Sequence, residues 1–220
     1  MIRGAIFDAD GTLLDSMPIW EEAGAKYLHG LGVTPETGLA TILFSMTLEE
    51  SAAYLIRRYG LSQTVEETRG GILAVIRHFY ETEVSAKPGA QRFLQQLRQR
   101  GVPMVIATTG DGALLNAALA RLGLRPFFSR IFTCTEFQTS KNSPLIYQLA
   151  AKYMDAAPAH TFVFEDVLHA LRAASAGGFK TVAVQDKASN GDAEQIRKIA
   201  DYYMADLLDF DTFWKVASGD

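Results

Sequence analysis

The chain has 220 residues, of which 48% are hydrophobic and 21% charged, and its formal net charge is −4. This length and composition predict a globular protein, and the negative charge argues against nucleic acid or an anionic membrane surface as its main partner. No apolar run approaches the ~18 residues of a membrane span, and a single cysteine excludes a disulfide framework. Acidic residues interrupt the region where a secretory signal would lie, so we expect a cytoplasmic protein.

The first predicted element is a short apolar run, residues 5–7, which is typical of a buried strand. Asp8 and Asp10 follow it, and Gly11 then permits a sharp turn. In an extended strand these carboxylates would point to opposite faces, so both serve one site only if the backbone turns between or just after them. Buried acids are costly unless they are paired or bind a cation. The spacing alone is compatible with either an ordinary acidic turn or a catalytic site.

The sequence patterns in residues from about 16 to 83 predict helices throughout this block. Ser16 is a candidate N-cap of the first helix, because a serine side chain can accept a hydrogen bond from the first turn. Two Thr-x-x-Glu patterns, which begin at Thr47 and Thr64, are capping boxes and predict two further helices. We therefore expect this block to be an all-helical insertion.

Beyond this block, helical patterns alternate with short apolar runs. The runs lie at residues 104–107, 130–134, 161–164 and 181–184, with a weaker one near 202–204. Unbroken apolar strands that alternate with helices are typical of a parallel sheet covered on both faces. We predict an α/β protein with a Rossmann-like parallel sheet in residues 1–15 and 84–220. Residues 16–83 would form a helical cap domain inserted after the first strand.

Several polar side chains follow strands or precede a helix at one predicted edge of this sheet. They are Asp8, Asp10, Thr108, Thr109, Lys141, Glu165 and Asp166. In open α/β sheets, ligands bind outside the carboxyl ends of the strands. Carboxylate oxygens suit Mg²⁺, while a lysine and hydroxyl groups neutralise and bind phosphoryl oxygens. Each residue alone is more typical of a loop or a solvated surface, but together they favour a site for a cation and a phosphate.

Four motifs occur in a fixed order: Asp8-Ala9-Asp10-Gly11-Thr12, then Thr108, then Lys141 with Pro144, then Glu165-Asp166. In these motifs the chain resembles the haloacid dehalogenase superfamily of phosphotransferases. The subgroup it resembles contains β-phosphoglucomutase and phosphoglycolate phosphatase, and the resemblance spans nearly the whole chain. It implies an α/β core with a helical cap and phosphoryl transfer through a covalent intermediate.

The resemblance also implies a role for each motif residue. Asp8 would be the nucleophile that becomes phosphorylated, and Asp10 the general acid and then the general base. The phosphoryl group would be bound by Thr108, Thr109 and Lys141. Mg²⁺ would be held by Asp8, by Asp10 through its backbone carbonyl, by Asp166 and, as a further candidate, by Glu165.

The chain departs from the family pattern at two places. Relatives often continue the acidic motif as Ser-x-x-Gly, whereas residues 167–170 are Val-Leu-His-Ala, which leaves a hydrogen bond that would support a metal ligand in doubt. Mutase-like relatives carry a cap histidine at the position matching Trp20 and an arginine near Leu48. The absence of both favours hydrolysis over sugar-phosphate mutation, and Asp10 argues against dehalogenation.

We therefore predict an Mg²⁺-dependent phosphatase that hydrolyses a small soluble phosphorylated metabolite through an aspartyl phosphate. A monomer or weak homo-oligomer is expected. A β-phosphoglucomutase-like mutase and a non-catalytic phosphate-binding module are the alternatives. A dinucleotide site is disfavoured because no Gly-x-Gly-x-x-Gly follows a predicted strand.

Overall fold

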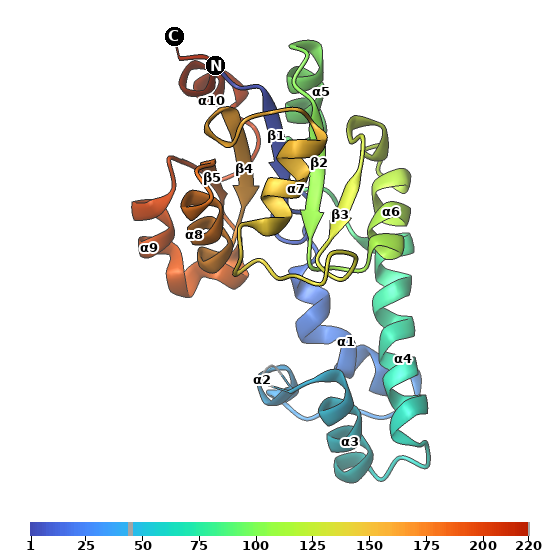
Figure 1. Ribbon diagram of the computed structural model, residues 1–220. Helices are drawn as coiled ribbons and strands as arrows, with labels where there is room; N and C mark the ends of the chain where they lie inside the picture. The colour runs from blue at the N-terminus through green and yellow to red at the C-terminus, as the bar shows by residue number, and fades with distance from the viewer. Residues whose placement is uncertain (44–45, 220) are drawn as a thin grey trace. The chain divides into compact units, whose positions relative to one another are not determined.

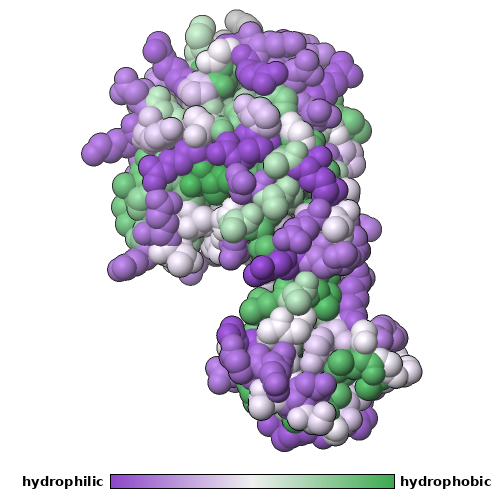
Figure 2. All heavy atoms as spheres, turned by 90° about the vertical axis from the view of Figure 1, so that its right-hand side faces the viewer, coloured by the Kyte–Doolittle hydropathy of each residue, from purple (hydrophilic) through white to green (hydrophobic). Residues whose placement is uncertain are grey.

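The computed structural model describes residues 1–43 and 46–219, which form two compact units (Figure 1). The first, here called the α/β unit, comprises Met1–Asp15 and Ser85–Asp220, and the second, the helical unit, comprises Ser16–Val84. On the face seen in Figure 2, hydrophilic residues predominate and apolar residues occur in small patches. Among the described residues, no helix combines the length and the hydropathy that a membrane crossing requires.

The α/β unit is built on a six-stranded sheet in the order β3-β2-β1-β4-β5-β6, and every neighbouring pair is parallel. The strands are β1 Gly4–Phe7, β2 Met104–Thr108, β3 Ile131–Thr133, β4 Thr161–Glu165, β5 Lys180–Val184 and β6 Tyr202–Met204. β1 is central, and its last residue, Phe7, is in register with Ile106 of β2 and Phe164 of β4. The predicted parallel sheet is confirmed, including its weakest strand.

Helices cover both faces of this sheet, as predicted. They are α5 Ala90–Gln99, α6 Gly112–Arg121, α7 Leu145–Tyr153, α8 Leu168–Ala176, α9 Ala193–Ile199 and α10 Phe210–Ser218, with short 3₁₀ helices η2 Arg125–Phe127, η3 Pro158–His160 and η4 Lys187–Asp192. Because side chains alternate along a strand, Ile6 packs with α7 and α8, whereas Phe7 lies on the other face. There Phe7 stacks on Phe164 at 4.1 Å between ring centroids, and Phe93 of α5 and Phe213 of α10 pack against that ring.

The helical unit lies between β1 and β2 in the chain and contains no strand in its described residues. Its elements are α1 Met17–Gly30, α2 Leu39–Leu43, α3 Leu48–Tyr59, α4 Val65–His78 and a π-helical turn, η1 Phe79–Glu83. Both predicted capping boxes, at Thr47 and Thr64, are present. Ser16 stands at the N-cap of α1 but makes no capping hydrogen bond there. Its backbone has helical angles (φ −104°, ψ −13°), whereas a capping side chain needs an extended backbone.

Candidate active site

The acidic turn after β1 is folded tightly against the end of β4. The Asp8 amide donates to the Phe164 carbonyl at 2.9 Å, which extends the pairing of β1 with β4 past the last residue of the strand. Gly11 has φ +86°, and a Cβ atom on it would lie 2.5 Å from Oδ2 of Asp166. The position therefore requires glycine for two reasons, its backbone conformation and the close approach of a carboxylate. Thr12 then donates through Oγ1 to Oδ1 of Asp166 at 3.2 Å.

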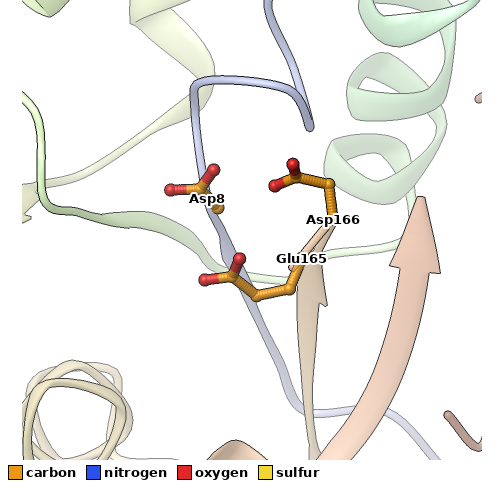
Figure 3. A group of neighbouring side chains, drawn as sticks. All are labelled: Asp8, Glu165 and Asp166. Carbon is orange, nitrogen blue, oxygen red and sulfur yellow. The ribbon is translucent and has the colours of Figure 1, made fainter. Parts of the chain in front are cut away.

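Asp8, Glu165 and Asp166 form a buried acidic cluster at the carboxyl ends of β1 and β4 (Figure 3). One carboxylate oxygen from each residue lies within 4.8 Å of the others. The three residues are exposed by only 6%, 0% and 2%. Three carboxylates this close repel one another strongly in a buried environment, so the arrangement calls for positive charge.

Lys141 supplies part of that charge. It lies in the turn before α7, is 4% exposed, and its Nζ contacts Oδ1 of Asp8 and, at 2.5 Å, Oε1 of Glu165. One lysine cannot neutralise three carboxylates. The structure thus brings four of the predicted site residues into one cluster with a formal excess of negative charge.

The pKa values of these groups reflect that imbalance. Burial raises the pKa of Asp8 well above its ordinary value, and the neighbouring carboxylates raise it further against the opposing effect of Lys141. Burial and then the charge of Glu165 raise the pKa of Asp166 to about 7. Burial alone would lower the pKa of Lys141, but Asp8 and Glu165 outweigh it and raise that pKa. A bound cation would favour the ionised carboxylates and lower both acidic pKa values.

Glu165 provides the observation that tests whether a metal fits. Its Oε1 accepts hydrogen bonds from Lys141 and from the Tyr147 hydroxyl, the latter at 2.8 Å. Its Oε2 is buried and has no hydrogen-bond partner among the described residues. An orphaned carboxylate oxygen within an oxygen-only donor set fits a hard divalent cation such as Mg²⁺.

Asp10 and Thr108 lie at the edge of this cluster. Thr108 is the buried last residue of β2, and its Oγ1 accepts from the Gly110 amide at 2.9 Å. A Cβ atom on Gly110 would lie 2.9 Å from Oδ2 of Asp10, so the Asp10 carboxylate is beside this turn. Asp10 itself is partly exposed, which leaves it accessible to a ligand. Thr109 follows the last residue of β2 and is exposed.

Two side chains that the sequence patterns did not single out contact the acidic cluster. Ser189, in the turn η4, donates to Oδ2 of Asp166 at 3.4 Å, so together with Thr12 it supplies support that the altered acidic motif left in doubt. Tyr147 belongs to an apolar helix pattern, which by itself indicates only that the residue is buried. That burial was the one sequence signal for a contact with the site, because a buried tyrosine hydroxyl needs a hydrogen-bond partner.

A family model for haloacid dehalogenase-like hydrolases matches residues 2–178. The chain belongs to this family. It is 29% identical over 185 residues to hexitol phosphatase A of Escherichia coli, which is 83% of this chain and 82% of that protein. It is also 32% identical over 151 residues to a phosphoglycolate phosphatase of Rhodobacter capsulatus, or 66% of this chain and 67% of that protein.

Solved structures agree on the fold of this haloacid dehalogenase-like hydrolase. A Thermotoga maritima protein assigned as a β-phosphoglucomutase superposes with a TM-score of 0.87 at 20% identity, covering 98% of this chain and 100% of that one. The predicted superfamily, its subgroup and the class of phosphoric monoester hydrolase are thereby confirmed.

Proposed function

We propose that the chain is an Mg²⁺-dependent phosphatase that hydrolyses a small phosphorylated sugar or polyol through an aspartyl phosphate on Asp8. The observation that carries the proposal is the buried cluster in which Asp8 contacts Lys141 beside Glu165 and Asp166. In-line phosphoryl transfer needs a nucleophile, a nearby positive charge and a metal site. The cluster supplies a carboxylate, a lysine and acidic side chains for these three roles.

In the first step, an Asp8 oxygen attacks phosphorus and the bond to the leaving alcohol oxygen breaks. Asp10, which is partly exposed at the edge of the cluster, gives its proton to that oxygen. In the second step Asp10 takes a proton from water as the water oxygen attacks phosphorus, which releases phosphate and restores the Asp8 carboxylate. Through these steps the Lys141 ammonium neutralises phosphoryl oxygens, and Thr108 and Thr109 supply further donors.

The metal would be held by Asp8, Asp166 and Glu165, with the backbone carbonyl of Asp10 as a further ligand. When bound, Mg²⁺ supplies positive charge that offsets the repulsion between the nucleophile and the phosphoryl group. The orphaned Oε2 of Glu165 and the raised pKa values of Asp8 and Asp166 support this assignment.

We further propose that the helical unit is a cap that selects the substrate. Hydrolysis of a sugar or polyol phosphate is supported by relatives named hexitol phosphatase A and fructose-1-phosphate phosphatase, both of Escherichia coli. The alternative is a mutase, because the fold is shared with proteins assigned as β-phosphoglucomutases. Trp20 and Leu48, where mutase-like relatives have polar residues, favour hydrolysis.

Phosphate release from a panel of sugar, polyol and carboxylic-acid phosphomonoesters tests the proposal, with and without Mg²⁺. We expect Mg²⁺-dependent turnover that Asp8→Asn abolishes, whereas Asp211→Asn, an exposed carboxylate on α10, retains it. Full activity of Asp8→Asn, or no turnover of any phosphomonoester, would refute the phosphatase. Isomerised product that appears only with a bisphosphate activator would establish the mutase instead.

A further inference from the structure

Tyr147 is a deeply buried polar side chain next to the acidic cluster. It lies on α7 with 1% exposure, and its ring packs edge-on against Phe179 at 6.1 Å between centroids. Its hydroxyl reaches past this apolar surrounding and donates to Oε1 of Glu165 at 2.8 Å. The bond joins two fully buried groups, so it is shielded from competing water.

This hydrogen bond distinguishes the two oxygens of Glu165. Oε1 accepts from both Tyr147 and Lys141, which occupies its two lone pairs. Oε2 is buried and accepts from no described residue. One oxygen of the carboxylate is therefore held by the protein, and the other is left with its lone pairs available to a cation.

The terminal torsion of a glutamate is soft, so a carboxylate held by a lysine alone can rotate and exchange its two oxygens. A second donor from a rigid helix, aimed at the same oxygen, fixes the plane of the carboxylate. We propose that Tyr147 is a positioning residue of the cation site, which orients Glu165 so that Oε2 faces the cation. The inference rests on the proposed function only in taking Mg²⁺ as that cation.

The hydroxyl is suited to this role because it stays a donor. A phenol with its ordinary pKa of about 10 keeps its proton at neutral pH, so the Tyr147 hydroxyl can donate to Oε1 of Glu165. Tyr147 does not reach the phosphoryl site itself in this assignment. Its effect is transmitted through Glu165 to the metal.

The experiment compares Tyr147→Phe with Tyr153→Phe, a matched control on the same helix. Tyr153 is 49% exposed, and both changes remove one phenolic oxygen and nothing else. Mg²⁺ is titrated calorimetrically into the metal-free proteins, and circular dichroism verifies that each is folded. We expect about 10- to 100-fold weaker Mg²⁺ binding for Tyr147→Phe, the usual effect of losing an outer partner of a metal ligand. Tyr153→Phe should bind as the wild type does.

A double-mutant cycle with Glu165→Ala separates this role from a general loss of packing. If Tyr147 acts through Glu165, Tyr147→Phe weakens Mg²⁺ binding in the wild-type background and has no further effect beside Glu165→Ala. Wild-type affinity in Tyr147→Phe, or an equal loss in both backgrounds, overturns the inference. If Tyr147→Phe weakens Mg²⁺ binding but the wild type hydrolyses no phosphomonoester, the inference is supported and the proposed function is overturned.

Discussion

Replacing Gly11 by alanine should separate backbone strain from damage to the site. Gly11 has φ +86°, a conformation that costs a residue with a side chain about 1 to 2 kcal/mol. The added Cβ would also lie 2.5 Å from Oδ2 and 2.8 Å from Cγ of Asp166, distances at which one of the two groups must move. Because Asp166 is 2% exposed and held by Thr12, the carboxylate cannot move without losing its hydrogen bond.

Gly101→Ala is the matched control for this substitution. Gly101 has φ +72°, so it carries the same kind of strain, but a Cβ atom on it would meet nothing within 4 Å. Gly101→Ala should lose about 1 to 2 kcal/mol of unfolding free energy, which for a chain of this size lowers Tm by roughly 2 to 8 °C. Gly11→Ala should lose more, because its Cβ atom also displaces Asp166. Only Gly11→Ala should lose phosphatase activity, by about 100-fold or more, since Asp166 is a proposed metal ligand and misplacement of a site group by about 1 Å has an effect of that order.

Urea unfolding and phosphate release are measured on both variants to separate the effect of the contact with Asp166 from that of backbone strain. Wild-type turnover in Gly11→Ala would show that the contact between Gly11 and Asp166 is not needed for function. A comparable loss of turnover in Gly101→Ala would assign the effect to strain, and the reasoning from the close approach would be wrong.

Lys141→Met removes the cation that contacts two carboxylates of the acidic cluster and should abolish turnover, which an assay of phosphate release at saturating Mg²⁺ checks. Phe93→Ala empties a fully buried position among four other aromatic rings and should cost about 3 to 5 kcal/mol in urea unfolding. Glu36→Gln tests a pH dependence, because hydrogen bonds from Arg58 and then Tyr54 lower the Glu36 pKa. A lowered pKa stabilises the fold above the ordinary glutamate pKa, and this is lost as the pH falls through the folded value. Tm of Glu36→Gln should therefore lie below that of wild type at pH 7 and converge with it in acid; equal values at pH 7 would contradict this.

The sheet and most helices could be predicted because their signals are local. Unbroken apolar runs mark strands covered on both faces, and the capping boxes at Thr47 and Thr64 place two helix starts correctly. The short helix α2 and the π-helical turn η1 lie in the block predicted to be helical, but no comparable pattern indicates where each begins and ends. The predicted capping hydrogen bond of Ser16 is absent, because serine permits capping but the backbone angles of this residue at the start of α1 do not.

Sequence motifs were sufficient to predict which residues form the candidate site. Asp8, Lys141, Glu165 and Asp166 are brought together from three separate segments because parallel strands end at one edge. The contacts that orient them were not predictable, since they depend on distances that no local pattern encodes. Tyr147 illustrates this: its spacing on α7 indicates only burial, and its partner becomes known once β4 is placed beside that helix.

The most direct test of the central claim is to trap the covalent intermediate. Protein incubated with Mg²⁺ and a turned-over phosphomonoester is quenched in acid, digested, and its peptides are analysed by mass spectrometry. We predict phosphate on Asp8 in the wild type and none in Asp8→Asn. Turnover without phosphate on Asp8, or phosphate carried by another residue, would contradict the account.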